Sequence, residues 1–198
     1  MNSAVIVQVE EQSLFQMANG GAVPTSPLQF AVKEISHLTA QNAYKKWHYL
    51  RGQSFIGMYN FGAYYDGWLG GAISFGPPSA EETILGLFGH KDQNGYFEIK
   101  RLAMNDSWPK NSESRFIAIS MKLLKNMTNV KGIITYADTS MGHRGTIYKA
   151  TNFEYKGLTA SKKDYWVNGK IQQRGKINGD GVWKDRARKH LFVYEFTG

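Results

Sequence analysis

Residues 135–157, TYADTSMGHRGTIYKATNFEYKG, constrain what this chain can fold into more than any other stretch. A short β-branched run, 132–137, overlaps its start and predicts a buried strand that stops at Asp138. The unit continues with a loop, a short helix and another strand, over residues 139–145, 146–150 and 153–157. In α/β proteins, ligands bind where a strand end meets a loop and a helix N-terminus. The competing interpretation is an ordinary connection in which Asp138 only caps the loop or the helix.

Strands and helices elsewhere in the chain indicate the class of fold. Asp66-Gly67 suits a type I′ turn between two aromatic-rich strands, and a second hairpin is predicted about Asn168-Gly169. The predicted strands are 29–35, 55–65, 68–75, 96–104, 132–137, 153–157 and 191–196, and the longer helices are 40–49, capped by Thr39, and 113–127, capped by Ser112. Antiparallel strands followed by α/β crossovers predict an α/β (α+β) fold, with a mixed central sheet and flanking helices.

A cluster of glycine and proline residues over 19–27 separates a predicted leader, residues 1–28, from a predicted domain, residues 29–198. The order of elements in that domain resembles the Gcn5-related N-acyltransferase superfamily. The resemblance implies a donor arm held between splayed central strands and phosphates held by a glycine-containing loop before the main helix. Here the corresponding loop, 101–112, contains no glycine, so its backbone cannot wrap a pyrophosphate in the usual way. The sequence therefore argues against conventional acetyl-CoA binding.

The formal net charge of the chain is +8, and most of the excess lies in its C-terminal part. Residues 152–198 contain ten Lys or Arg against five Asp or Glu, so five of the eight net charges lie there. This asymmetry favours a polyanionic partner, nucleic acid first, although a solvated basic surface is the alternative. The absence of cysteine excludes disulfides, thiolate catalysis and cysteine-ligated zinc. No apolar run is long enough to span a membrane, so we expect a cytoplasmic protein.

Four short motifs carry a sharper resemblance. They are His48-Tyr49 at the end of the first helix, Arg101 before the main helix, Tyr136-Ala137-Asp138, and the run GHRGTIYKATNF over 142–153. Together they resemble the Mom family of phage proteins, a divergent branch of the same superfamily, over about residues 30–197. The resemblance implies an enzyme of the host-cell cytoplasm that converts adenine in phage DNA to N6-carbamoylmethyladenine. Such DNA resists host restriction nucleases.

The predicted catalytic residues are His48, Tyr49, Asp138 and Tyr148. The N6 amine of adenine is a poor nucleophile, so its acylation needs a hydrogen-bond acceptor, a stabilised oxyanion and oriented reactants. Asp138 suits the acceptor beside a flipped-out adenine, and Tyr148 lies where the superfamily often keeps an acid for the leaving group. His48 and Tyr49 would supply a base or clamp the adenine ring. The alternatives are that Tyr148 is a core residue and that His48 only caps a helix, stabilised by its dipole.

The predicted donor-binding residues are Arg101, Ser114 and Ser140. A charge at the strand position of Arg101 is costly unless it binds an anion or pairs with Glu98 or Asp138. Acetyl-CoA supplies no nitrogen, whereas a glycyl group contains every atom of the carbamoylmethyl group. The predicted donor is therefore glycyl-tRNA, and a coenzyme A thioester such as acetyl-CoA is the alternative. In that alternative, His48, Tyr49 and Asp138 would hold a metal centre, with iron as the metal.

A further set of residues is predicted to contact DNA, namely His143, Arg144, Lys162, Lys163, Arg186, Arg188 and Lys189. The expected partner is double-stranded DNA with a flipped adenine, and tRNA is a second partner if it is the donor. We expect no membrane partner. Two other functions stay open. One is a conventional acetyl-CoA-dependent N-acetyltransferase that acts on a small amine or protein, and the other is a non-catalytic nucleic-acid-binding module.

Overall fold

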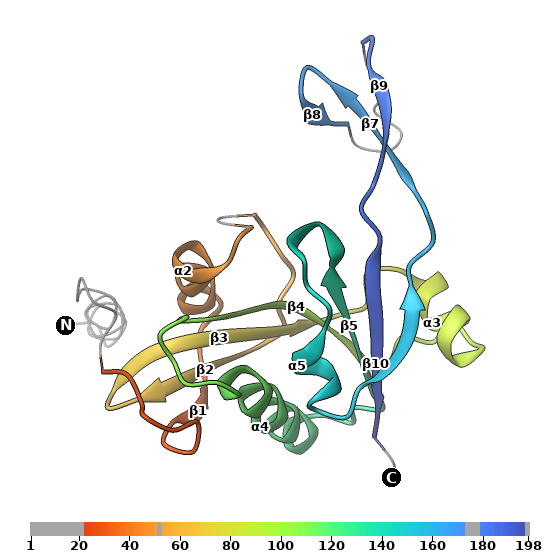
Figure 1. Cartoon of the computed structure of the whole chain (residues 1–198). Helices are drawn as coiled ribbons and strands as arrows, with labels where there is room; N and C mark the ends of the chain where they lie inside the picture. Colours follow the sequence, from red (N-terminus) through yellow and green to blue (C-terminus); the bar gives the residue numbers. More distant parts are fainter. Residues whose placement is uncertain (1–21, 51–52, 173–178, 197–198) are drawn as a thin grey trace, which may run out of the picture.

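A computed structural model describes residues 22–50, 53–172 and 179–196 of the chain (Figure 1). The strands are β1 (Ala31–Glu34), β2 (Tyr59–Tyr65), β3 (Trp68–Gly76), β4 (Tyr96–Met104), β5 (Gly132–Asp138), β6 (Glu154–Leu158), β7 (Lys163–Val167), β8 (Lys170–Ile171), β9 (Val182–Asp185) and β10 (Lys189–Glu195). The helices are α2 (His37–Trp47), α3 (Glu81–Phe88), α4 (Ser112–Met127) and α5 (Thr146–Lys149), and a 3-10 turn, η1 (Thr139–Met141), follows β5. Most of the predicted leader lies outside the described residues.

Seven strands form one mixed sheet in the order β1-β2-β3-β4-β5-β10-β6. Only β4 and β5 pair in parallel; the other neighbours in this sheet are antiparallel. The antiparallel part includes the β2–β3 hairpin, whereas the helical crossover α4 joins the parallel pair β4 and β5. The predicted α/β class with a mixed central sheet is confirmed.

The helices cover both faces of this sheet. Successive strand residues point to opposite faces, and neighbouring residues of β5 accordingly belong to different apolar clusters. Ile133 lies in the cluster that contains the buried side of α4, whereas Ile134 packs with Ile84 of α3. The small residues of α2 pack with Leu69 of β3 in a third cluster. Figure 1 shows α4 and α5 on the side of the sheet away from α2.

Several predicted boundaries are wrong by a few residues, for local reasons. Helix α2 begins three residues before the predicted start, because the Ser36 side chain accepts the N–H of Thr39 and acts as the N-cap. Ser112 does not cap α4; its hydroxyl donates to the carbonyl of Pro109 at 2.7 Å, and Asn111 precedes the helix. Helix α3 was not predicted, although acidic residues fill its first turn and Gly89 ends it in the left-handed region.

Strand β4 contains a β-bulge at Lys100. The register with β3 pairs Ser74 with Arg101 and Phe75 with Ile99, so Lys100 is an extra residue of β4 between two successive pairs. A bulge shifts the alternation of the residues that follow it. It places Arg101 on the α2 side of the sheet, where its guanidinium carbon lies 5.9 Å from the centroid of the Phe55 ring.

The three remaining strands form a small sheet of their own, β8-β7-β9, which we call the arm. Figure 1 shows it standing clear of the seven-stranded sheet, with β9 leading directly into β10. The predicted hairpin is present, since Asn168 and Gly169 both have positive φ, at 49° and 73°. The glycine-rich stretch 175–181, which the sequence predicts to be a loop, lies mostly outside the described residues.

Candidate active site

A small pocket opens where β4 and β5 diverge. The two strands pair in parallel only over residues 96–98 and 132–134, although β4 runs on to Met104 and β5 to Asp138. The wedge between them holds a cavity of about 180 Å³, which we call the splay pocket. Its lining includes His48, Tyr49, Arg101, Asp138, His143 and Tyr148. The fold therefore brings the four predicted catalytic residues to one place.

Asp138 ends β5 and is half-buried at the edge of the pocket. Its Oδ1 atom accepts two hydrogen bonds from Ser140, from the backbone N–H at 2.9 Å and from the hydroxyl at 2.6 Å. These bonds hold the carboxylate in one orientation. The hydroxyl of Ser140, which was predicted to bind the donor, is thus engaged in positioning Asp138.

His48 is the C-cap residue of α2, and its side chain is buried. The Nδ1 atom of its ring accepts a hydrogen bond from the backbone N–H of Leu50 at 3.0 Å. Burial, together with the charges of Arg101 and His143, lowers the pKa of His48 to about 4. The ring is therefore neutral at pH 7, with its proton on Nε2, because Nδ1 is an acceptor. His48 can donate a hydrogen bond from Nε2, but it is not a dipole-stabilised cation.

Tyr49 forms a row of rings with its neighbours at the mouth of the pocket. It stacks on His48 with centroids 4.4 Å apart and planes at 24°, and it meets His143 edge to face at 5.7 Å. Burial and the nearby charge of Asp138 raise the pKa of the Tyr49 phenol. His143, which was predicted to contact DNA, is exposed and also lines the pocket.

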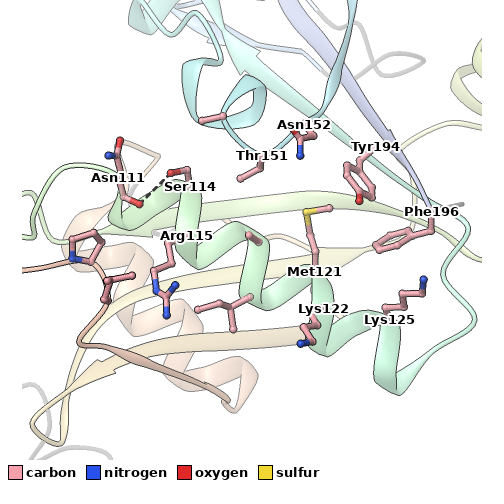
Figure 2. Close-up of a pocket in the computed structure, with 15 residues that line it drawn as sticks. Asn111, Ser114, Arg115, Met121, Lys122, Lys125, Thr151, Asn152, Tyr194 and Phe196 are labelled. Atoms are coloured by element: carbon pink, nitrogen blue, oxygen red, sulfur yellow. Dashed lines mark hydrogen bonds between the residues drawn. The ribbon is translucent and has the colours of Figure 1, made fainter.

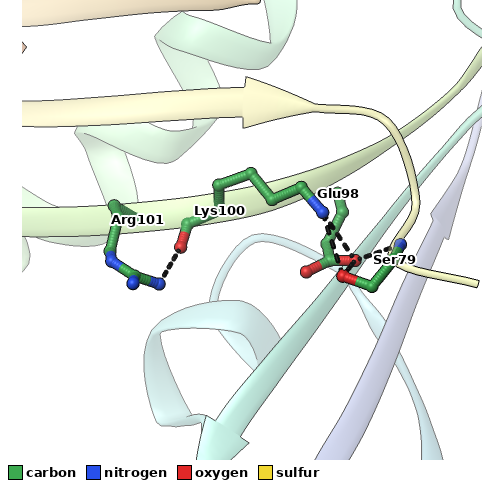
Figure 3. A network of polar contacts seen from close by, with 4 residues as sticks. All are labelled: Ser79, Glu98, Lys100 and Arg101. Atoms are coloured by element: carbon green, nitrogen blue, oxygen red, sulfur yellow. Dashed lines mark hydrogen bonds and ion pairs between the residues drawn. The ribbon is translucent and has the colours of Figure 1, made fainter. Parts of the chain in front are cut away.

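Arg101 brings a positive charge to the pocket. Its Nη1 atom donates to the carbonyl of Lys100 at 2.9 Å. Figure 3 shows that Glu98 is engaged elsewhere, since its Oε2 atom accepts the N–H and hydroxyl of Ser79 and lies 3.1 Å from Lys100 Nζ. Within the described part of the chain, no carboxylate forms an ion pair with Arg101. Its charge is therefore available for an anion, rather than for the internal salt bridge that was the alternative.

Tyr148 of α5 is both a core residue and a pocket residue. Its ring lies 5.7 Å from that of Phe153 and 5.5 Å from that of Phe192, and the side chain is buried. Burial is the main cause that raises the pKa of the Tyr148 phenol, and the nearby Thr135 hydroxyl acts in the opposite direction. The phenol thus stays protonated at neutral pH and can act as an acid. Tyr148 can therefore be both a core residue and the predicted catalytic acid.

A second pocket, of about 440 Å³, lies beside the start of α4 and the loop before α5. We call it the helix-side pocket. It shares four lining residues with the splay pocket, namely Tyr136, His143, Ile147 and Tyr148. Two reactants can therefore approach the same wall from two sides. Its lining also includes the acidic residue Glu113.

The glycine-free loop before α4 uses many of its backbone amides internally. The N–H of Asn105 donates to the carbonyl of Gly70 at 2.8 Å, and the N–H of Trp108 donates to the carbonyl of Asn105 at 3.0 Å. Ser107 and Ser112 likewise donate their backbone N–H groups to Asn105 and Pro109. These four amides are unavailable to a phosphate, which agrees with the sequence argument against a conventional pyrophosphate site.

A groove of about 740 Å³ runs along α4, shown in Figure 2, and it is larger than the splay pocket and the helix-side pocket. Ser114 lines this groove rather than the splay pocket, and its hydroxyl donates to the carbonyl of Asn111 at 3.1 Å. The structure therefore does not bring Ser114 together with Arg101, as a shared donor site would require. The groove also contains Arg115, Lys122 and Lys125.

The predicted DNA contacts are distributed between the pocket and the arm. Lys189 lines the splay pocket, while Arg144 lies on the exposed loop before α5 and lines the helix-side pocket. Lys162 and Lys163 are exposed at the start of β7. The two remaining arginines are partly engaged, Arg186 with the carboxylate of Asp164 and Arg188 with the carbonyls of Leu158 and Thr159.

Two other predictions concern metal and membrane. Within residues 22–50, 53–172 and 179–196, no group of three or more His, Asp or Glu side chains is placed to hold a metal ion. In the predicted metal centre of His48, Tyr49 and Asp138, His48 could bind the metal only through Nε2, because its Nδ1 atom already accepts the Leu50 N–H. In the same residues, no helix has the length and apolar character needed to cross a membrane.

The sequence did not reveal the supports behind the pocket. The hydroxyl of Tyr44 lies 2.7 Å from Ser74 Oγ and 3.4 Å from the carbonyl of Arg101, and Ser74 donates to Asn60 at 2.5 Å. This buried network joins α2 to β2, β3 and β4 behind Arg101. Burial raises the pKa of the Tyr44 phenol. In the sequence, the only sign of this network is that single polar residues interrupt apolar strands.

Comparison with known proteins agrees with this geometry. The model of the Mom protein family matches residues 29–191. The methylcarbamoylase Mom of Escherichia phage Mu is 28% identical over 171 residues. The alignment covers 83% of this chain but 65% of the phage Mu protein, so this chain matches less than two thirds of that relative's length.

Solved structures with a similar fold are acetyltransferases. NAA60 of Arabidopsis thaliana, in complex with acetyl-CoA, has a TM-score of 0.54 at 14% identity, over 85% of this chain and 99% of that one. An acetyltransferase of the GNAT family from Streptococcus pneumoniae has a TM-score of 0.51 at 9% identity, over the same shares. At such identities the likeness concerns the fold alone, and it confirms the predicted acyltransferase-like architecture.

Proposed function

This chain belongs to the Mom protein family, and from that premise we propose that it is a transferase that acylates the N6 amine of adenine in DNA. The observation that carries the proposal is the convergence of Asp138, His48, Arg101 and Tyr148 on the splay pocket. The final product is N6-carbamoylmethyladenine, which protects phage DNA from restriction in the cytoplasm of the host. The name of the phage Mu relative, methylcarbamoylase, supports this choice of product.

The acceptor enters the splay pocket as a flipped-out adenine. A base inside a duplex presents neither face of its ring nor a free N6 amine, so it must leave the stack. The exposed ring of Tyr49, stacked on His48, offers a surface on which the purine stacks. Asp138 then accepts a hydrogen bond from the N6 amine with the carboxylate oxygen that Ser140 does not hold.

The residues of the pocket divide the chemistry of acyl transfer between them. Asp138 takes the proton from N6 as the amine attacks the donor carbonyl. The Nε2–H of His48 and the guanidinium of Arg101 stabilise the oxyanion of the tetrahedral intermediate. Tyr148, whose phenol stays protonated, donates a proton to the leaving group from the wall that the two pockets share.

The donor approaches from the helix-side pocket. We favour glycyl-tRNA over a coenzyme A thioester, because four loop amides near the start of α4 are already engaged. The carboxylate of Glu113 in this pocket also suits the ammonium of a glycyl ester better than a pyrophosphate. The complexes of solved acetyltransferases with acetyl-CoA support the thioester as the alternative. Iron held by His48, Tyr49 and Asp138 belongs to that alternative.

Glycyl transfer leads to the final product through one rearrangement. The N6 amine displaces the tRNA hydroxyl from the glycyl ester and becomes an amide. The free glycyl amine then attacks C6 and forms a five-membered ring, and cleavage of the original C6–N6 bond leaves that nitrogen in the terminal amide. DNA labelled with 15N at N6 tests this step. The label should appear in the amide, and a label retained in the amine bonded to C6 would exclude the rearrangement.

The function is tested by mass spectrometry of nucleosides from plasmid DNA of bacteria that express the protein, beside an empty vector. We expect a deoxyadenosine that is heavier by C2H3NO, and fragmentation separates the carbamoylmethyl form from a glycyl amide. Unmodified DNA together with acetylation of a small amine or a protein would favour a conventional acetyltransferase. Unmodified DNA together with tight duplex binding would favour a non-catalytic module.

A further inference from the structure

The register of β7 and β9 sorts the side chains of the arm into two faces. Lys163 pairs with Asp185 and Tyr165 with Trp183, so these four residues share one face. Asp164 pairs with Lys184 and Trp166 with Val182 on the other face. There the Nζ atom of Lys184 lies 5.0 Å from the centroid of the Trp166 ring.

The second face extends toward the root of the arm and is the more basic of the two. The backbone N–H of Arg186 donates to the carbonyl of Lys162, which continues the same alternation. We call the face that carries Lys162, Asp164, Trp166, Val182, Lys184 and Arg186 the basic face. Its one carboxylate, Asp164, is buried and paired with Arg186. Lys162 and Lys184 are exposed, so their charges face solvent. On the opposite face, the exposed carboxylate of Asp185 lies across from Lys163.

The root of the arm adjoins the splay pocket. Only residues 186–188 separate β9 from β10, and Lys189, the first residue of β10, is the register partner of Asp138. Two hydrogen bonds brace this connection, from Arg188 Nε to the carbonyl of Thr159 and from the Thr139 hydroxyl to the carbonyl of Arg188, each at 2.6 Å. The arm is therefore fixed at its base beside the pocket.

We propose that the arm binds duplex DNA through its basic face and follows a groove beside the flipped adenine. The major groove of B-DNA admits a two-stranded β-ribbon, and β7 and β9 form an antiparallel pair of this kind. Lysines along one face of the ribbon meet phosphates, and the arm fixes the register of the duplex over the pocket. Exposed Val182 adds apolar contact on the same face. This inference rests on the proposed function, because it takes DNA as the substrate.

Two single substitutions on opposite faces of the arm form a matched test. Lys184→Gln and Lys170→Gln each remove one exposed charge, but Lys170 pairs with Val167, on the face that carries Tyr165. Duplex affinity is measured by fluorescence anisotropy across a series of salt concentrations, with a labelled duplex and no acyl donor. Each phosphate contact contributes about −0.9 to the slope of log K against log salt. We expect Lys184→Gln to reduce the slope by about this amount and to weaken binding several-fold at low salt.

The control, Lys170→Gln, should leave affinity and slope unchanged, and the charge-conserving Lys184→Arg should retain affinity. The double variant Lys162→Gln/Lys184→Gln should reduce the slope by about 1.8. Equal losses for Lys184→Gln and Lys170→Gln would show that only net charge acts, and no loss in either would also overturn the proposal. Because the assay contains no donor, the result does not depend on the reaction. If the protein still modifies DNA although substitutions on the basic face do not weaken duplex binding, this inference is refuted and the proposed function stands.

Discussion

Asp138 and Lys189 are direct cross-strand partners, the last residue of β5 opposite the first residue of β10. Both line the splay pocket. Strand β10 therefore forms the edge of the pocket with β5 and also continues the arm. In the proposed function, a duplex bound by the arm would have a fixed position relative to an adenine in the pocket.

The neutral state of His48 predicts a specific dependence of stability on pH. Its pKa is about 4 in the folded chain, below its ordinary value of 6.5. Between these values the unfolded chain binds more protons, so stability is lost as pH falls from 6.5 toward 4. We expect this residue to account for about 1 kcal/mol of that loss, after allowance for solvent screening. Urea unfolding of wild type and His48→Gln at pH 7 and pH 4.5 measures the difference. Equal losses of unfolding free energy in the two proteins between pH 7 and pH 4.5 would contradict this prediction.

Removal of the Tyr148 hydroxyl should separate the proposed role of this residue as an acid from its role in core packing. Tyr148→Phe keeps the ring that packs on Phe153 and Phe192, so we expect the free energy of unfolding to change by no more than about 1 kcal/mol. Turnover should fall by about 10²–10⁴, as for the loss of an acid. Tyr155→Phe is the control, because its hydroxyl contacts His190 outside the pocket at 2.9 Å. Full turnover in Tyr148→Phe would leave the residue with a packing role only.

The close approach of Trp108 to Gly70 predicts a large effect of one methyl group. A Cβ atom at Gly70 would lie 1.9 Å from the Trp108 ring, so Gly70→Ala must displace the loop before α4. We expect a loss of about 2–4 kcal/mol in the free energy of unfolding. Gly86→Ala is the control, since nothing lies within 4 Å of a Cβ in that helix position, and it should stabilise the protein by up to about 1 kcal/mol. Equal unfolding midpoints for the two variants would refute this packing.

The sequence predicted those parts of the fold that depend on local signals. The two hairpin turns were predicted because Asp66-Gly67 and Asn168-Gly169 accept positive φ at both positions. The strand that ends at Asp138 and the helix after the loop were predicted from a β-branched run and the residues that follow it. These features need no knowledge of distant contacts.

Features that depend on distant contacts were not predicted. The bulge at Lys100 turns Arg101 toward α2, and only the pairing of β3 with β4 reveals it. The state of His48 depends on the backbone of Leu50 and on the charge of Arg101, which lies far away in the sequence. The separation of Ser114 from Arg101 likewise follows from which side of α4 faces the groove.

In the proposed function, the splay pocket modifies adenine with Asp138 as the acceptor of the N6 proton. The most direct measurement is the amount of modified deoxyadenosine, by mass spectrometry, in plasmid DNA from bacteria that express wild type, Asp138→Asn or Asp185→Asn. Asp185→Asn is the control, because it makes the same change on the arm, away from the basic face. We expect a loss of at least about 100-fold for Asp138→Asn, with the variant folded, and no loss for the control. Wild-type levels of modification in folded Asp138→Asn would contradict this proposal.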